Sequence, residues 1–417
     1  LAMVGSADYN NKEIKGEVNV ALALRQPGSA IKPVTYLTAL EKGWNPATII
    51  EDEQTTFPGY PPYTPRNYDG QFHGKVTVRS ALANSYNIPA VKALQFVGVP
   101  SMLEMSRRLG ITSFGPASQY GLALTLGGGE VRLLDLTAAY GVFANHGKYV
   151  PPVSILKITD AQGNVLDQWP GAKPQTVVDA GRAYMITSIL SDNAARTPAF
   201  GPNSPLRLSR PAAVKTGTTD DFKDNWTVGY TGQLVTGVWV GNADNTPMRG
   251  TTGLTGAAPI WHDFMEYALK PLPVDPLTPP PGLQKVRVAR DSGKLWVEGC
   301  PEPPIEEFVL NGQAPTARCE QPTPTPSPTV DPLATFRAEM AAHTPRATST
   351  PLPSVSELRE RAATTATAAA AIAAPTVAER RAATSAHLAA VEATIAAQVA
   401  RRAERTPLPT PSPRPAR

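Results

Sequence analysis

The stretch RQPGSAIKP, residues 25–33, contains the pattern on which the interpretation of this chain depends. Ser29 and Lys32 form a Ser-x-x-Lys motif, and the apolar spacing that follows predicts a helix over residues 29–42. Residues i and i+3 of a helix share a face, so the lysine amine could accept the serine proton. A free lysine has a pKa of about 10.4, so burial or a nearby cation is needed to make it a base at neutral pH. The positive end of the helix would stabilise an oxyanion at the serine.

Two later motifs make the Ser-x-x-Lys pattern specific. Ser85-Tyr86-Asn87 alone would indicate a cap or turn, and Lys215-Thr216-Gly217 alone could be a solvated strand end. Ser-x-x-Lys, Ser-x-Asn and Lys-Thr-Gly in this order are, however, the set that occurs in β-lactamases and penicillin-binding proteins. The set usually has Asp at the middle position of the second motif, where this chain has Tyr86.

The chain resembles the transpeptidase domain of class A penicillin-binding proteins from residue 1 to about 270, and more weakly to about 320. AMVGSADY at 2–9 and KTGTTDDFKDNW at 215–226 support the resemblance, as does the segment 126–147. It implies an α+β, penicillin-binding protein/β-lactamase-like serine transpeptidase fold, with an antiparallel sheet flanked by helices.

The resemblance implies a role for each polar residue of the motifs. Ser29 would be the acylated nucleophile and Lys32 its proton acceptor. Ser85 would pass a proton to the leaving amine, Asn87 would hold the substrate amide and place Lys32, and Lys215 would supply positive charge.

The remaining implied roles concern substrate binding. Thr216 and Thr218 would hold the terminal carboxylate, and Gly217 would let the backbone approach a carbonyl. The backbone N–H groups of Ser29 and Thr218 would form the oxyanion hole. No metal or other cofactor is expected, because no Cys/His cluster has metal-ligand spacing.

The activity implied is D,D-transpeptidation, which joins peptidoglycan stem peptides through an acyl-Ser29 intermediate and is inhibited by β-lactams. A D,D-carboxypeptidase, a β-lactamase and a β-lactam-binding sensor are the alternatives. Class A members also carry a glycosyltransferase domain and a membrane anchor ahead of this domain. The chain starts at Leu1 and shows neither, so we expect a fragment of a bifunctional synthase at the outer face of the cytoplasmic membrane. Its partners would be lipid-linked precursor, nascent strands and unspecified cell-wall synthesis proteins.

Charge and composition separate a body from a tail. The net charge of +4 lies within residues 331–417, and the residues before them carry equal numbers of basic and acidic side chains. A neutral body argues against nucleic acid as its partner. No run of 18 apolar residues predicts a membrane span.

We expect four parts along the chain. They are a transpeptidase domain at 1–270, a Pro-rich linker at 271–282, a small module bounded by Cys300 and Cys319 at 283–320, and a disordered Pro/Ala-rich tail at 321–417. Capping boxes predict helices in the tail at 354–374 and 376–405. The two cysteines would form a disulfide in an exported protein, the alternative being two buried thiols.

Periodicity predicts the elements of the body. Residues 226–230 and 235–240 alternate as a hairpin, and residues 1–20 read as a strand, a turn and a short segment. Besides 29–42, helices are expected at 76–97, 100–109, 133–145, 179–192 and 258–269.

Penicillin should label Ser29 covalently. We expect one drug mass on the peptide that contains Ser29, read by mass spectrometry of the digested protein, and no label on Ser29→Ala. Labelling that persists in Ser29→Ala would remove Ser29 as the nucleophile.

Overall fold

A three-stranded antiparallel sheet lies at the centre of the computed structural model, which describes residues 2–59 and 61–320. The sheet has the order β7-β8-β9, with β7 at Ala213–Thr218, β8 at Asp224–Tyr230 and β9 at Val235–Gly241. The last two strands are the predicted hairpin. Register pairs Gly217 with Trp226 and Trp226 with Trp239.

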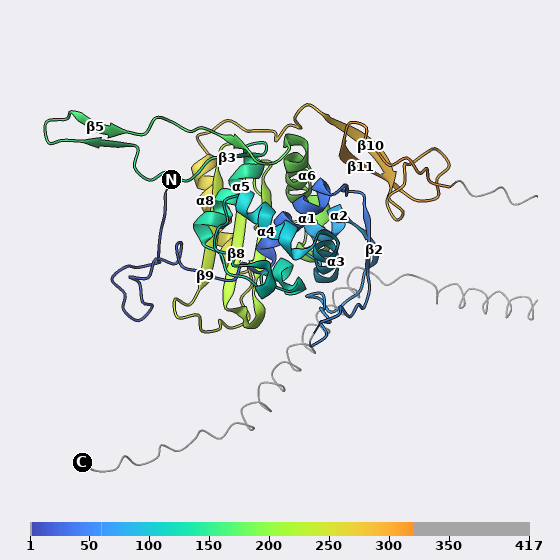
Figure 1. The fold of residues 1–417 in the computed structure, drawn as a ribbon, viewed down its shortest axis with the longest axis horizontal. Helices are drawn as coiled ribbons and strands as arrows, with labels where there is room; N and C mark the ends of the chain where they lie inside the picture. Colours follow the sequence, from blue (N-terminus) through green and yellow to red (C-terminus); the bar gives the residue numbers. More distant parts are fainter. Residues whose placement is uncertain (1, 60, 321–417) are drawn as a thin grey trace, which may run out of the picture. The chain divides into compact units, whose positions relative to one another are not determined.

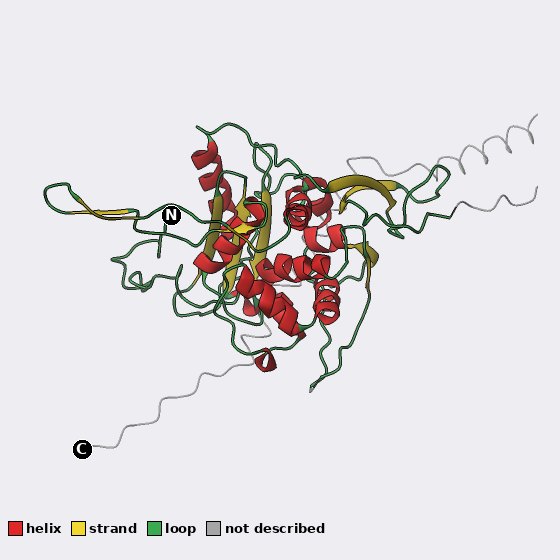
Figure 2. Ribbon diagram, turned by 45° about the horizontal axis from the view of Figure 1, so that its top comes forward, coloured by secondary structure: helices red, strands yellow, loops and turns green. Residues whose placement is uncertain are grey.

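Helices cover both faces of this sheet (Figures 1 and 2). On one face, Trp226, Val228 and Tyr230 join the main core together with α1, α5 and α6. On the other face, Val214 packs with Trp261 in a smaller core beneath α8. Alternate residues of each strand therefore enter different cores, as the period of two requires. The larger helices are α1 (Lys32–Glu41), α5 (Leu133–Ala144), α6 (Ala180–Ser191) and α8 (Ala257–Leu269).

Helix α1 is the centre of the main core. Nine of its ten residues are buried, so it is enclosed on all sides rather than amphipathic. Pro33 lies in the first turn, where its missing N–H leaves no hydrogen bond unmade. The remaining helices around it are α2 (Val78–Ala83), α3 (Asn87–Val97), α4 (Val99–Arg108) and α7 (Asn193–Phe200), with short 3-10 turns at η1 (Gly28–Ile31), η2 (Ala117–Gln119), η3 (Leu122–Leu126) and η4 (Asp220–Phe222).

Four two-stranded antiparallel ribbons surround this body. They are β1 (Ile49–Asp52) with β2 (Gly74–Thr77), β3 (Lys148–Tyr149) with β6 (Gln175–Thr176), β4 (Lys157–Thr159) with β5 (Val165–Gln168), and β10 (Leu283–Ala289) with β11 (Pro304–Leu310). The β4–β5 ribbon extends away from the helices in Figure 1.

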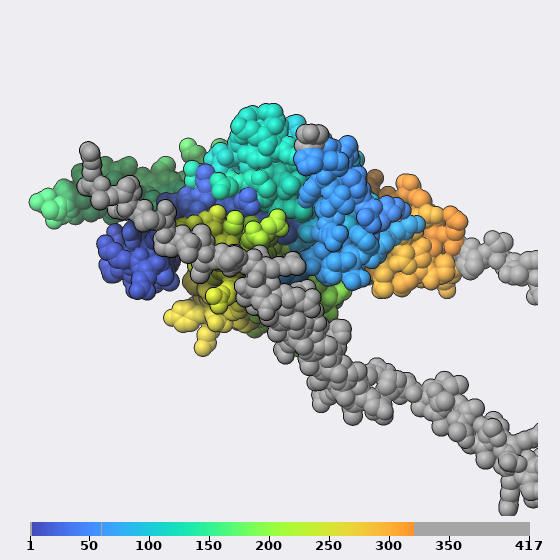
Figure 3. All heavy atoms as spheres, turned by 90° about the horizontal axis from the view of Figure 1, so that it is seen from below, coloured from blue at the N-terminus to red at the C-terminus, as the bar shows by residue number. Residues whose placement is uncertain are grey.

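The β10–β11 ribbon is joined to the helical body through a buried ion pair. Arg79 of α2 donates from Nε and Nη2 to the two carboxylate oxygens of Glu307, at 2.7 and 2.6 Å, and Glu307 is fully buried. Figure 3 shows the orange surface of this ribbon directly beside the blue surface of the segment that precedes α2. Cys300 and Cys319 form a disulfide, which confirms that expectation.

Most predicted elements of the body are present, and two predictions were wrong. The helix expected at 76–97 is divided into α2 and α3, because the chain turns sharply at Ser85, where φ is 63°. Residues 2–20, all of them described, contain turns and no strand. The four-part division remains a prediction, and the tail with its expected helices lies outside the described residues.

Replacing Glu307 by Ala should lower the free energy of unfolding by about 3 kcal/mol, because Arg79 would lose its buried bidentate partner and keep only the longer ion pair with Asp192. Urea denaturation measures this change. Glu306→Ala is the matched control, since its ion pair with Lys285 is exposed and should contribute less than about 1 kcal/mol. Equal changes in the two variants would contradict the importance of the buried pair.

Candidate active site

Two fully buried aromatic residues donate hydrogen bonds to the segment that carries Ser29. Trp226 Nε1 donates to the carbonyl oxygen of Gln26 at 2.8 Å, and the Tyr140 hydroxyl donates to the carbonyl oxygen of Ala30 at 2.7 Å. Ser29 itself is half-buried within η1. Amides in the first turn of a helix have no partner within it, so this position suits an oxyanion-binding N–H.

Glycines allow this segment to lie directly on strand β7. Gly28 has φ of 53°, and a Cβ there would come within 2.5 Å of the Thr218 carbonyl oxygen. A Cβ on Gly217 would overlap the carbonyl oxygen of Pro27. No other residue type fits at either position without displacing the backbone. The glycines of RQPGS and Lys-Thr-Gly therefore set the separation between the two motifs.

The Thr218 amide faces the segment of Ser29 rather than the interior of the sheet. Thr219 donates its N–H to the Asp224 carbonyl oxygen at 3.1 Å, so residue 219 forms a hydrogen-bonded pair with β8. Because hydrogen-bonded and non-hydrogen-bonded pairs alternate along an antiparallel ladder, the Thr218 N–H points away from β8. Among the residues described, no further strand pairs with β7 on that side. The two amides proposed for the oxyanion hole thus belong to adjoining backbone segments.

Lys32 is fully buried, and its amine is surrounded by oxygens of the second motif. Lys32 Nζ lies 2.6 Å from the Ser85 carbonyl oxygen, 2.7 Å from Asn87 Oδ1 and 3.1 Å from the Tyr86 carbonyl oxygen. The sharp turn at Ser85 brings both carbonyl groups to the same side of the chain. A left-handed conformation at a serine is strained, and it persists only where its surroundings hold it.

The Ser85 hydroxyl connects the two lysines of the site. Lys215 Nζ donates to Ser85 Oγ at 2.8 Å, and Lys32 Nζ lies 3.4 Å from the same oxygen. Lys215 reaches Ser85 because it occupies the face of β7 that packs on the main core. Thr216 and Thr218 occupy the opposite face, where Thr218 Oγ1 accepts a hydrogen bond from the Gly253 N–H at 3.0 Å.

Burial and mutual repulsion change the acidity of both lysines. Burial lowers the pKa of Lys32 well below its usual value, the positive charge of Lys215 lowers it further, and the carboxylate of Asp52 acts in the opposite direction. Burial lowers the pKa of Lys215 to about 7. A lysine with a lowered pKa can accept a proton at neutral pH, which a free lysine cannot.

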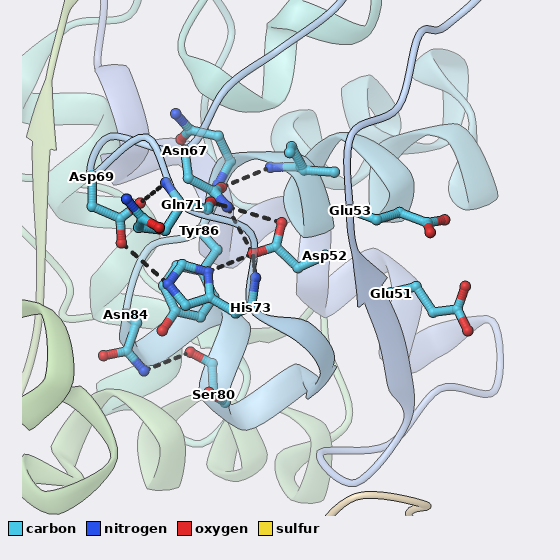
Figure 4. A network of polar contacts seen from close by, with 12 residues as sticks. Glu51, Asp52, Glu53, Asn67, Asp69, Gln71, His73, Ser80, Asn84 and Tyr86 are labelled. Atoms are coloured by element: carbon cyan, nitrogen blue, oxygen red, sulfur yellow. Dashed lines mark hydrogen bonds and ion pairs between the residues drawn. The ribbon is translucent and has the colours of Figure 1, made fainter.

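The structure therefore joins Lys32 to Ser85 and Asn87, joins Lys215 to Ser85, and lays the segment of Ser29 on β7 through the approach of Gly28 to Thr218. Sequence reasoning missed a second layer behind these residues, which consists of Asp52, Asn67 and His73 (Figure 4). The polar stretch at 66–73 was the only signal in the sequence, and no spacing rule connects it with the three motifs.

Neither a metal site nor a membrane-crossing helix is visible in residues 2–59 and 61–320. No group of three or more His, Cys, Asp or Glu residues there could hold a metal ion. None of the helices in this part is both long and apolar enough to span a bilayer.

Residues 1–266 match the family described as the penicillin binding protein transpeptidase domain. The chain belongs to the penicillin-binding protein transpeptidase family. The resemblance to class A members and the expected fold are thereby confirmed, and the domain is that of a serine acyl transferase.

Named relatives agree with this membership. Penicillin-binding protein 1A of Aquifex aeolicus is 37% identical over 330 residues, which cover 76% of this chain and 43% of the relative. Penicillin-binding protein 2D of Bacillus subtilis is 34% identical, with 76% and 46% covered. The chain thus spans less than half the length of these relatives. The crystal structure of penicillin-binding protein 1A from Haemophilus influenzae has a TM-score of 0.64 at 27% identity, over 73% of this chain and 51% of that one.

The pH dependence of penicillin acylation should report the charge of Lys215. If Lys32 must be unprotonated to act as the base, acylation rises with pH through the pKa of Lys32. Lys215→Met removes a cation that lowers this pKa, so the acidic limb should move to higher pH.

The measurement is the second-order rate constant of benzylpenicillin acylation between pH 5 and 10. Lys75→Met, at an exposed position of β2, serves as the control and should leave the limb in place. A limb that is unchanged in Lys215→Met would mean that Lys215 does not act on the base.

Proposed function

We propose that this domain is a D,D-transpeptidase that joins peptidoglycan stem peptides through an acyl-Ser29 intermediate. The observation that carries the proposal is the fully buried Lys32 amine, three positions after Ser29 and joined through the Ser85 hydroxyl to Lys215. Family membership supports the reaction class, and the residue roles are our assignment.

The acylation step uses Lys32 as the base. A neutral amine has two N–H bonds and one lone pair. The two shortest contacts of Lys32 Nζ, to the Ser85 carbonyl oxygen and Asn87 Oδ1, use both N–H bonds. Once the lone pair has taken the Ser29 proton, the Tyr86 carbonyl oxygen at 3.1 Å is an acceptor for the third N–H. Ser29 Oγ then bonds to the carbonyl carbon between the two terminal D-alanines.

Collapse of the tetrahedral intermediate breaks the C–N bond. The amides of Ser29 and Thr218 would stabilise its oxyanion. Ser85, in contact with both lysines, would transfer the proton from Lys32 to the leaving nitrogen. The terminal D-alanine leaves as a neutral amine, and the acyl group remains on Ser29.

Substrate binding relies on β7. The Lys215 charge would attract the terminal carboxylate, and the hydroxyls of Thr216 and Thr218 would donate to it. Gly217 keeps this edge of the strand close to the Ser29 segment, and Asn87 would hold the substrate amide. An amine from a second stem peptide would then attack the acyl-Ser29 ester, lose a proton to Lys32, and release Ser29.

We further propose that the domain works within a bifunctional cell-wall synthase at the outer face of the cytoplasmic membrane. The class A resemblance supports this arrangement, because members of that class combine a glycosyltransferase with the transpeptidase. β-Lactams would be inhibitors, since their ring amide can acylate Ser29 in place of the peptide.

An acceptor-amine assay tests the reaction. Purified protein with a D-Ala-D-Ala stem peptide and an acceptor amine should give a cross-linked peptide dimer, detected by mass spectrometry, and Ser29→Ala should give none. Lys32→Ala should lower the rate by about 10²–10⁴, as loss of a positioned proton acceptor does.

The other products distinguish the alternatives. Free D-alanine without a dimer would indicate a D,D-carboxypeptidase, and a stable penicillin adduct without peptide turnover would indicate a β-lactam sensor. Rapid release of hydrolysed penicillin would indicate a β-lactamase.

A further inference from the structure

Behind the second motif, a fully buried carboxylate organises a loop from another part of the chain (Figure 4). Asp52 lies at the end of β1 and accepts hydrogen bonds from Asn67 Nδ2 at 2.9 and 2.7 Å. It also accepts from the His73 amide at 3.1 Å, and its Oδ2 lies 2.6 Å from His73 Nδ1. Four such contacts satisfy a buried carboxylate, which would otherwise destabilise the fold.

Asn67 connects Asp52 with Asn87 through hydrogen bonds. Asn67 Oδ1 accepts hydrogen bonds from the backbone N–H groups of Asn87, at 2.8 Å, and Ile88, at 3.3 Å, at the start of α3. The preceding residue, Arg66, accepts from Asn87 Nδ2 at 2.8 Å through its carbonyl oxygen. That bond fixes Nδ2 as the donor of the Asn87 side-chain amide, so Asn87 Oδ1 is the atom directed at Lys32.

His73 supports the middle residue of the motif. Its ring stacks on Tyr86 with the centroids 3.9 Å apart and an interplanar angle of 16°. Asp52 and Asp69 lie within hydrogen-bond distance of its two ring nitrogens. The position that holds Asp in the usual form of the motif is thus filled here by an aromatic ring whose partner comes from the same loop.

These contacts explain how the strained turn at Ser85 is maintained. The residues on its C-terminal side, Tyr86 and Asn87, are both bonded or stacked to the loop that Asp52 organises. The loop therefore restricts the positions of the three oxygens that surround Lys32 Nζ. A displacement of about 1 Å in such groups can reduce a reaction rate by about 10²-fold.

We propose that Asn67 and Asp52 are positioning residues for acyl transfer, acting through Asn87 and the Ser85 turn on the amine of Lys32. This inference rests on the proposed role of Lys32 as the base. Asp52 has an electrostatic part as well, because its charge acts on Lys32 against that of Lys215. The groups facing Asp52 are Asn67 and His73, its charge also acts on Tyr36 and Tyr86, and Arg66 and Asp69 are further charged residues of the loop at 66–73.

The first test is Asn67→Ala. Acylation by benzylpenicillin should fall about 10- to 100-fold in a protein that still shows a cooperative thermal transition. Asn84→Ala is the matched control for stability, since Asn84 is as buried as Asn67 but is bonded to α7 and not to the loop. It should lower the thermal midpoint and leave the acidic limb of the pH–rate profile at its parental position.

The second test, Asp52→Asn, separates positioning from simple loss of structure. Removal of the negative charge lowers the pKa of Lys32, so the acidic limb should move to lower pH, opposite to Lys215→Met. Glu53→Gln changes the same charge at the adjacent, exposed position and should not move it.

The parental protein makes the result interpretable. If parental protein is not acylated at Ser29, the proposed function fails and this inference fails with it. If the parent is acylated, a folded Asn67→Ala that reacts at the parental rate would overturn the positioning role. A folded Asp52→Asn that is acylated at the parental rate with an unmoved acidic limb would do the same, whether or not Asn67→Ala folds.

Discussion

The burial of the Lys32 amine is the constraint on which the rest of the site depends. A lysine enclosed in an apolar core is unfavourable as a cation, so its surroundings either satisfy it with oxygens or remove its proton. Here three oxygens from residues 85–87 lie around it, and the nearby Lys215 opposes its charge. The turn at Ser85 and the helix break that accompanies it follow from the need to direct backbone oxygens into the core.

Two glycines allow the segment that carries Ser29 to lie directly against the central sheet. Gly28 and Gly217 remove the side chains that would keep the Ser29 segment away from β7. The nucleophile, the base and the strand edge can then share one small volume. The charged groups of the site come from separate elements, yet they act on each other directly because no side chain lies between these backbones.

The sequence allowed the three motifs, the central hairpin and most helices to be predicted, because each depends on a short local pattern. The break at Ser85 was not predicted, because the helical periodicity of residues 76–97 outweighs the cap or turn signal of Ser85-Tyr86-Asn87, and the contacts with Lys32 that hold the turn are not local. The segment 1–20 resembled a strand in composition, but a strand also needs a partner, which spacing alone does not reveal. The positioning role of Asp52 and Asn67 was not predicted, because each is an ordinary strand or turn residue in its local sequence.

The ion pair between Arg79 and Glu307 has a consequence for the order in which the molecule forms. Its partners are 228 residues apart, so a large loop must close before the contact can stabilise anything. Arg79 lies in α2, immediately ahead of the turn at Ser85. During synthesis, α2 leaves the ribosome long before β11, the strand that carries Glu307. Until that strand arrives, Arg79 can pair with Asp192 but lacks its two hydrogen bonds to Glu307, so the contact between α2 and β11 forms late in folding.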